Sequence, residues 1–296
     1  MRNLVEKVPL TDPLILHNRT RSRTEAFQSS LPDPSAAIIA DTVAAGVAAA
    51  DIIFTCLADD DAISSTIEEA LQGDVKGKLF VDCSTVHPDT TTALGRRVEE
   101  KGADFVAAPV FGAPAMADAG KLIAVLAGTP PAVARARPYF KGSTASAEID
   151  LSSPDQTAQV SWTRALALKV LGNTFVFNMV EQLAEGFTAA EKSGLGTAPL
   201  RAFVEAVFPG PYAAYAERML SGDYHTREEP LFAVDLARKD LRHAASLTGA
   251  AGVKMPAAEA ADRHLARVKE RQGPKGDMAG IYGAVREEAG LKYENS

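Results

Sequence analysis

The stretch from Gln159 to Phe187, QVSWTRALALKVLGNTFVFNMVEQLAEGF, decides how the rest of the chain divides. Apolar residues occupy most of its sides rather than a single stripe, and a helix with this pattern is expected to be buried. It contains Lys169 and Asn173, which are four residues apart and therefore share one face of a helix. A lysine in this setting either extends its stem to water or has a chemical role, and the helix alone leaves both interpretations open.

Upstream of this helix, apolar segments of strand length alternate with helical patterns, which is typical of a mostly parallel sheet covered by helices on both faces. We expect strands at residues 14–16, 37–39, 51–57, 78–83, 104–108 and 121–127. After about residue 155 the pattern is helical throughout, with breaks at Pro209-Gly210, Gly252 and Gly273-Pro274. The sequence therefore predicts an α/β Rossmann-type domain over residues 1–152 and an all-α domain over residues 153–296.

Composition and charge favour a globular protein and argue against a nucleic-acid-binding or membrane-spanning one. The 296 residues are 46% hydrophobic and 23% charged, as in globular chains with room for two domains. The net charge of -7 argues against a nucleic-acid partner, because phosphate binding depends on clustered Lys and Arg. No apolar run reaches the length of a membrane span, and the N-terminus shows no signal or transit pattern, so we expect a cytoplasmic protein. Cys56 and Cys83 lie in apolar runs and are expected to be reduced core residues.

A sheet of this kind binds ligands beyond the carboxyl ends of its strands. The glycine-rich turn that would hold a dinucleotide diphosphate is missing after the first strand. Gly194-Leu195-Gly196 follows a helical segment and is interpreted as a helix end. The run HNRTRSR (His17 to Arg23) follows the strand at 14–16, where an arginine such as Arg19 favours the 2′-phosphate of NADP(H). A solvated basic turn is the simpler interpretation of this run taken by itself.

Five motifs occur in a fixed order over nearly the whole chain. They are N-R-T (18–20), D-C-S-T-V-H-P (82–88), A-P-V-F-G-A (108–113) followed by G-K-L (120–122), K-V-L-G-N (169–173), and L-F through K-D-L (231–241). Together they resemble the β-hydroxyacid dehydrogenase family, which includes 3-hydroxyisobutyrate dehydrogenase and has a 6-phosphogluconate dehydrogenase-like NADP-binding domain. Each motif is weak on its own, whereas the fixed order of five is specific.

The resemblance implies hydride transfer between NADP(H) and a small hydroxy acid, aldehyde or related carbonyl compound. Lys169 would be the catalytic acid/base, its pKa lowered by apolar surroundings, and Asn173 would orient the substrate or the lysine. Substrate binding is expected at Ser84, Thr85, Phe111, Gly112 and Ala113, and cofactor binding at Asn18, Arg19, Thr20, Leu57, Ala58 and Lys239. A homodimer with interlocked long helices is also implied. No metal, nucleic-acid or membrane partner is expected, since the five histidines lack ligand spacing.

Two departures from the family pattern bear on these roles. Phe111 and Ala113 replace a serine and a glycine of the substrate loop, so we expect a bulkier and more apolar substrate face. The family begins with a strand and G-x-G-x-x-G, whereas this chain begins inside the expected first helix. We therefore expect an N-terminally truncated or degenerate Rossmann domain whose sheet lacks a strand and has two unpaired edges.

Two other functions stay open at the sequence level. The first is imine reductase or reductive aminase chemistry on the same architecture, although its members usually carry an acidic residue or tyrosine where Lys169 stands. The second is a catalytically inactive dimer module. The missing phosphate loop favours an inactive module, while the retained Lys169, Asn173 and Ser84 oppose it.

Overall fold

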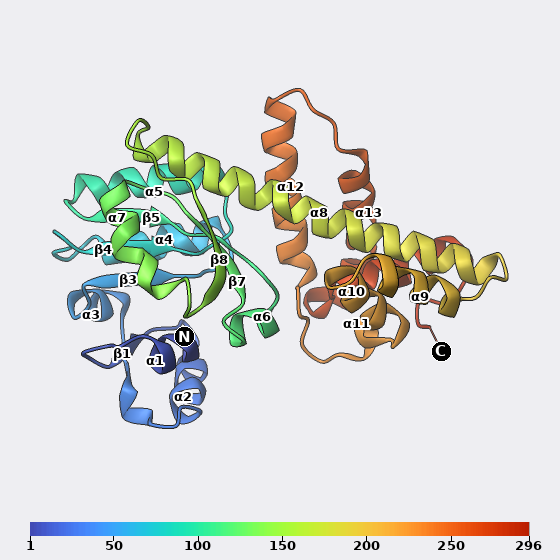
Figure 1. The fold of residues 1–296 in the computed structure, drawn as a ribbon, viewed down its shortest axis with the longest axis horizontal. Coiled ribbons are helices and arrows are strands. Elements are labelled where there is room, and N and C mark those ends of the chain that lie inside the picture. The colour runs from blue at the N-terminus through green and yellow to red at the C-terminus, as the bar shows by residue number, and fades with distance from the viewer. Residues whose placement is uncertain (296) are drawn as a thin grey trace. The chain divides into compact units, whose positions relative to one another are not determined.

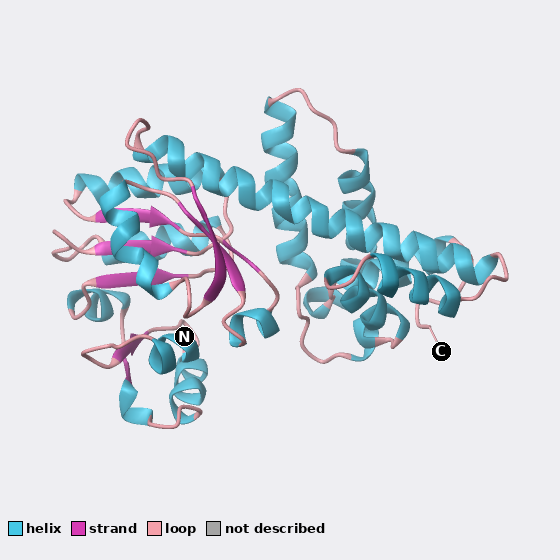
Figure 2. Cartoon of the chain, in the orientation of Figure 1, coloured by secondary structure: helices cyan, strands magenta, loops and turns pink. Residues whose placement is uncertain are grey.

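A computed structural model describes residues 1–295 of the chain, which form two compact units that divide between residues 169 and 170. Helices and strands alternate in the first unit, and the second is helical (Figures 1 and 2). The predicted fold class, a Rossmann-type α/β domain followed by an all-α domain, is confirmed. No described helix combines the length and apolar character needed to cross a lipid bilayer.

The first unit contains the strands and the helices between them. Its strands are β1 (Leu14–Leu16), β2 (Ala37–Ile39), β3 (Ile52–Thr55), β4 (Leu79–Asp82), β5 (Asp104–Ala107), β6 (Val110–Phe111), β7 (Leu122–Leu126) and β8 (Ala145–Asp150). Its helices are α1 (Arg2–Lys7), α2 (Arg21–Ser29), α3 (Val43–Ala48), α4 (Asp60–Ala70), α5 (Pro88–Glu100), α6 (Pro114–Asp118) and α7 (Pro130–Ala136), followed by the first part of α8 (Ala158–Lys192). Short 3₁₀ turns precede β2 and follow α7.

The strands form three small sheets rather than the single, mostly parallel sheet expected from the sequence. β1 pairs with β2 in parallel, and β3, β4 and β5 form a second parallel sheet. The third sheet consists of β6, β7 and β8, in which β6 runs antiparallel to β7. An isolated bridge between Ala107 and Ala127 links β5 to the end of β7. Among the described residues β1 pairs only with β2 and β3 only with β4, so each has an unpaired edge.

Helices cover both faces of the β3–β4–β5 sheet. On one face, Phe80 and Phe105 pack with side chains of α4, α5 and the start of α8, including the fully buried Trp162. The Trp162 indole is edge-on to Phe105 and its nitrogen donates to the Phe105 carbonyl at 3.3 Å. On the other face, Leu79 and Val81 pack against α7 and the third sheet. Burial on both faces explains why these strands are continuous apolar runs.

The second unit has one apolar core built on the continuation of α8. Its other helices are α9 (Thr197–Val207), α10 (Pro211–Leu220), α11 (Asp223–Thr226), α12 (Val234–Ala250), α13 (Pro256–Gln272) and α14 (Ile281–Glu288). The predicted long helix is present, since α8 extends over 35 residues. The expectation that it is buried on most sides is wrong at Phe175, whose surface is 79% exposed. A buried ion pair, His264 Nδ1 to Glu181 Oε1 at 2.7 Å, ties α13 to α8.

Candidate active site and dinucleotide site

The turn after β1 presents basic side chains at the carboxyl end of that strand. Asn18 Oδ1 accepts the Thr20 backbone N–H at 2.8 Å, which shapes the turn into α2. No side chain caps the first amides of α2. Asn18, Arg19 and Thr20 are all exposed. Backbone amides at a helix start and exposed guanidinium groups are donors of the kind that a phosphate accepts.

The loops that follow β3 and β4 are tied together by a buried carboxylate. Asp82 Oδ1 accepts the Thr55 hydroxyl at 2.8 Å and the Ser84 backbone N–H at 3.1 Å. The Ser84 hydroxyl accepts the Leu57 N–H at 2.9 Å. Burial raises the pKa of Asp82, and the hydrogen bonds from Ser84 and Thr55 oppose that rise.

This network gives Ser84 a structural role. Ser84 is buried and its hydroxyl accepts the Leu57 N–H, so it fixes the predicted cofactor segment, Leu57 and Ala58, against the predicted substrate segment, Ser84 and Thr85. Its predicted contact with a substrate stays a prediction. Sequence reasoning missed Asp82 as the centre of this network. The available signal was an acidic residue ending an otherwise apolar strand.

The acidic run and the histidine beside these loops have capping roles. Asp59 Oδ1 accepts the Ala62 N–H at 2.8 Å and so caps α4. Asp60 Oδ1 accepts the His87 N–H at 2.9 Å, which joins the start of α4 to the start of α5. His87 in turn caps α5 through the Asp89 N–H. Asp59, Asp60 and His87 thus stabilise the points where the loops after β3 and β4 enter α4 and α5.

The substrate loop predicted from the sequence lies between β6 and β7. Gly112 has φ 138°, a conformation that favours glycine, and an added Cβ would lie 2.7 Å from a Leu122 methyl carbon. Ala113 and Met116 are exposed, and α6 begins at Pro114. The loop therefore presents mostly apolar side chains, and its role as a substrate face stays a prediction.

Lys169 lies against this loop. Its ammonium nitrogen is 4.5 Å from the centroid of the Phe111 ring, and only 7% of the residue is exposed. The face of an aromatic ring attracts a cation, most strongly where water is excluded. Phe111, which departs from the family pattern, therefore holds the lysine that the family pattern makes catalytic.

In the second unit, Asn173, Lys239 and Asp240 form a buried polar cluster. Asn173 Nδ2 donates to Asp240 Oδ2 at 2.7 Å, and Lys239 Nζ lies 3.3 Å from Asp240 Oδ1. All three residues are less than a tenth exposed. Sequence reasoning proposed Asn173 and Lys239 separately, and the structure brings them together on one carboxylate, that of Asp240.

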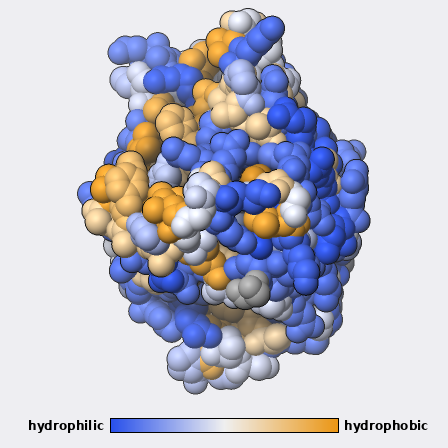
Figure 3. All heavy atoms as spheres, turned by 90° about the vertical axis from the view of Figure 1, so that its right-hand side faces the viewer, coloured by the Kyte–Doolittle hydropathy of each residue, from blue (hydrophilic) through white to orange (hydrophobic). Residues whose placement is uncertain are grey.

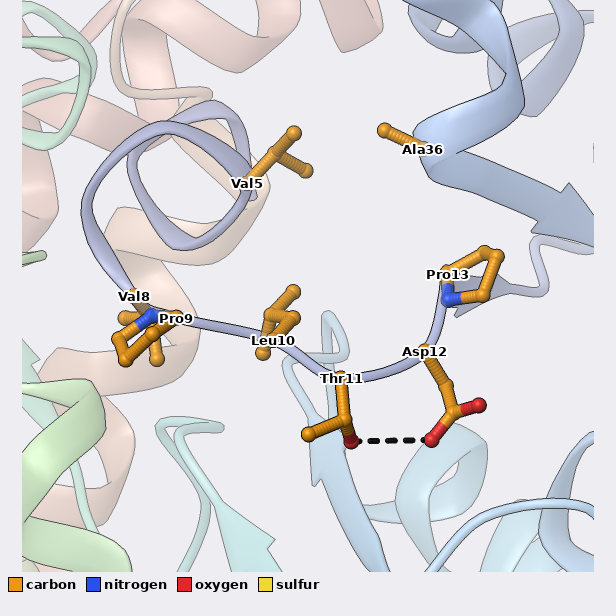
Figure 4. Close-up of a pocket in the computed structure, with 8 residues that line it drawn as sticks. All are labelled: Val5, Val8, Pro9, Leu10, Thr11, Asp12, Pro13 and Ala36. Carbon is orange, nitrogen blue, oxygen red and sulfur yellow. Dashed lines mark hydrogen bonds between the residues drawn. The ribbon is translucent and has the colours of Figure 1, made fainter.

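A hollow of about 350 Å³ lies elsewhere in the first unit, beside the segment that connects α1 to β1. Figure 4 shows Val5, Leu10, Pro13 and Ala36 around it, with Thr11 donating to Asp12 at 3.0 Å. Pro13 precedes β1, whereas Arg19 follows it, so the hollow is at the amino end of the strand. Ligands of parallel sheets bind at the opposite end, and the hollow is therefore distinct from the predicted dinucleotide site.

The two cysteines differ in their exposure. Cys83 is partly buried but Cys56 is exposed, so the expectation of two core cysteines is wrong for Cys56. Both thiols are unbridged. In the part of the chain that the structure describes, no three His, Cys, Asp or Glu side chains gather as metal ligands.

Two protein-family models match this chain, and a known protein is similar to it over nearly its whole length. The NAD-binding domain of 6-phosphogluconate dehydrogenase matches residues 10–151, and the NAD-binding domain of NADP-dependent 3-hydroxyisobutyrate dehydrogenase matches residues 164–285. The NADH-dependent oxidoreductase ucdB of Aspergillus ustus is 36% identical over 292 residues, which cover 98% of this chain and 96% of that protein.

Solved structures share the fold at lower sequence identity. The 3-hydroxyisobutyrate dehydrogenase of Mycobacterium tuberculosis superposes with a TM-score of 0.77 at 20% identity, covering 96% of this chain and 94% of that one. An imine reductase from Pseudomonas sp. superposes with a TM-score of 0.58 at 17% identity, covering 96% and 93%.

Proposed function

The chain belongs to the 3-hydroxyisobutyrate dehydrogenase-like family of NAD(P)-binding oxidoreductases, and on this premise we propose that it interconverts a small carbonyl compound and its alcohol with NADP(H). When bound, the nicotinamide would supply or accept the hydride. The observation that carries the proposal is the buried Lys169, whose ammonium faces the Phe111 ring of the substrate loop.

Lys169 has the chemistry required of the acid/base. Reduction of a carbonyl leaves negative charge on its oxygen, and an ammonium group can donate a proton to that oxygen. In the reverse direction the neutral amine would accept the hydroxyl proton. Because Lys169 is buried, its charge acts in a medium of lower dielectric constant than water, where it stabilises developing negative charge more strongly.

Asn173 and Lys239 are the further residues that we propose for this step. A carboxylate only accepts hydrogen bonds, so Asp240 fixes the Asn173 amide with its nitrogen toward Oδ2. The amide oxygen is then the atom that Asn173 offers to a proton donor, such as a hydroxyl or ammonium group. Lys239, beside the same carboxylate, would contribute positive charge toward the cofactor.

The proposed preference for NADP(H) rests on Arg19. The relative from Aspergillus ustus is named as NADH-dependent, and so the preference is a proposal about the residues of this chain. Arg19 is exposed at the carboxyl end of β1, where a 2′-phosphate would lie, and α2 begins there without a side-chain cap. Backbone groups of Leu57 and Ala58, which follow β3, would contact the adenine ribose.

The apolar loop from Phe111 to Met116 indicates a substrate with an apolar group near the reacting carbon. A serine at position 111 would donate a hydrogen bond to a carboxylate, whereas phenylalanine offers no donor. We therefore favour carbonyl substrates larger and less polar than a short hydroxy acid. Ser84, Thr85 and the backbone of Gly112 and Ala113 are the proposed polar contacts.

A titration and a turnover assay on the same variants test this function. Fluorescence titration with NADPH should saturate, and the wild-type chain should oxidise or reduce members of a panel of aldehydes, ketones and their alcohols. Lys169→Ala should lower turnover on the order of 10²- to 10⁴-fold, because the acid/base is lost, while NADPH binding is unchanged. Lys192→Ala, which alters the exposed last residue of the same helix, is the control.

The outcomes separate the candidate functions. Substantial turnover by Lys169→Ala would rule out its role as acid/base. Turnover of cyclic imines but of no carbonyl compound would favour the imine reductase alternative. We retain this alternative because the imine reductase from Pseudomonas sp. shares the fold. A chain that binds neither NADPH nor NADH would instead be a non-catalytic module.

A further inference from the structure

The three arginines near the start of α2 differ in their ionic partners. Arg21 Nε lies 2.9 Å from Glu25 Oε1, and Arg21 Nη1 donates to the Asp41 carboxylate. The hydrogen bond to Asp41, followed by the one to Glu25, raises the pKa of Arg21. Within residues 1–295, the side chains of Arg19 and Arg23 make no hydrogen bond or ion pair. One of the three positive charges is therefore already balanced by two carboxylates.

Asp41 reaches Arg21 because of the register of β1 and β2. The two strands are parallel and Leu16 pairs with Ile39, so the chain leaves both strands at the same edge. Asp41 follows β2 by two residues and Arg21 opens α2 after β1. The Asp41 side chain is 79% exposed, which leaves it beside any phosphate that binds at this edge.

We propose that Asp41 sets the dinucleotide preference of this protein by pairing with Arg21 and weakening the attraction of this edge for the 2′-phosphate of NADP(H). The inference rests on the proposed function, because it assumes that a dinucleotide binds after β1. A guanidinium held by two carboxylates cannot present the same N–H groups to a phosphate. The Asp41 carboxylate would also repel the phosphate directly, whereas the uncharged 2′-hydroxyl of NADH would meet no such repulsion.

Arg19 and Arg23 would then be the residues that bind the 2′-phosphate. The protein would therefore use NADH more readily than it would if all three arginines were available to the phosphate. Removal of the Asp41 charge should release Arg21 and increase affinity for NADPH alone. The group is exposed, so the gain should be modest and should shrink at high ionic strength.

Asp41→Asn tests the inference by fluorescence titration with NADPH and with NADH at low and high ionic strength. We expect NADPH to bind about three- to fivefold more tightly at low ionic strength, as an exposed charge pair predicts. NADH affinity should change by less than about twofold, because it has no 2′-phosphate. Glu25→Gln, which removes the other partner of Arg21, should shift NADPH affinity in the same direction. Asp155→Asn, the same change at an exposed position between β8 and α8, should change neither affinity.

A double variant identifies Arg21 as the mediator. Arg21→Gln should weaken NADPH binding little, since its charge is already balanced, and Asp41→Asn added to Arg21→Gln should recover less than half of the gain. The full gain in that background, unchanged NADPH affinity in Asp41→Asn, or a loss confined to NADH would each overturn the inference. Binding of neither nucleotide by any variant would overturn the cofactor assignment itself, so the two failures are distinguishable.

Discussion

At the scale of single residues, Asp240 lies between two side chains with proposed roles in the reaction. Its Oδ2 accepts Asn173 Nδ2 at 2.7 Å, and its Oδ1 is 3.3 Å from Lys239 Nζ. Because the carboxylate is 3% exposed, these two groups supply the compensation that a buried charge needs. Asp240 is thereby a positioning residue, which acts through Asn173 and Lys239 rather than on the substrate.

Asp240→Asn should lower turnover on the order of 10²-fold, because an amide can donate as well as accept and no longer fixes the orientation of Asn173. Turnover should be measured together with the thermal unfolding midpoint, so that loss of function is separated from loss of fold. Asp235→Asn is the matched control, since Asp235 is on the same helix, exposed, and paired with Lys269 at 2.5 Å. Turnover of Asp240→Asn within about twofold of the wild type would contradict the positioning role.

The sequence predicted many of these residues but not their partners. Lys169, Asn173 and Lys239 were proposed because they stand in motifs of the family that the sequence resembles, and their roles in the reaction stay predictions. The central role of Asp82 was missed, and so was the hydrogen bond that Ser84 accepts. A hydroxyl group in a motif does not reveal whether packing has already given it a partner, here the Leu57 N–H.

At the scale of elements, the close packing of α5 on α8 depends on a glycine. An added Cβ at Gly95 would lie 2.4 to 2.7 Å from three carbons of the Trp162 ring, which no real Cβ contact tolerates. The indole is fully buried and held by its hydrogen bond to Phe105, so it cannot move aside easily. Gly95 therefore sets how near the two helices can approach.

Gly95→Ala should destabilise the protein by about 1–3 kcal/mol, because overpacking outweighs the higher helix propensity of alanine. The free energy of unfolding in urea measures the effect, with Trp162 fluorescence as the probe. Gly186→Ala in α8 is the control, since its added Cβ would meet a Leu200 methyl carbon at 3.5 Å, an ordinary contact. That change should be neutral or stabilising by up to about 1 kcal/mol. Equal effects of the two substitutions would argue against the clash.

The elements were predicted where burial on both faces gives a continuous apolar run, as in β3, β4 and β5. β8 was missed because its sequence, ASAEID, leaves most of its residues exposed or half-exposed and reads as a polar segment. The two-residue β6 was missed because it is too short for periodicity to mark. Capping at Asp59 was predictable because the residue types of helix starts are local signals.

At the scale of the whole molecule, the two-part fold was predicted from the change from alternating strands and helices to helices alone. This change is visible in the sequence because strands and helices differ in hydrophobic periodicity. The separation of the strands into three sheets was not predicted as such, since pairing depends on contacts between distant segments. The expectation of two unpaired edges agrees with the observed pairing, since among the described residues β1 pairs only with β2 and β3 only with β4. The expectation of truncation concerns residues outside the given sequence and stays a prediction.

The second unit exposes an aromatic patch, defined here by Leu195, Phe203, Val207 and Phe208, whose residues are 44 to 56% exposed. Phe203 and Phe208 lie edge to face at 6.0 Å, and Phe208 stacks on Tyr212 at 5.1 Å. Figure 3 shows apolar residues gathered among polar ones on the face of the molecule that it presents. Monomers seldom leave adjacent aromatic groups in water, and we propose that a second copy of the chain covers this patch.

Light scattering after size-exclusion chromatography should therefore give the mass of a dimer for the wild-type chain. Phe203→Ser combined with Phe208→Ser should weaken dimerisation by at least about 30-fold, since buried aromatic residues at interfaces contribute about 2 kcal/mol or more. Val253→Ser, at another exposed apolar position of the second unit, should leave the dimer intact. A wild-type monomer at micromolar concentration, or a dimer unaffected by the double substitution, would show that the aromatic patch does not bind a second copy. In the second case Phe175 on α8, which is 79% exposed, is the next residue to substitute.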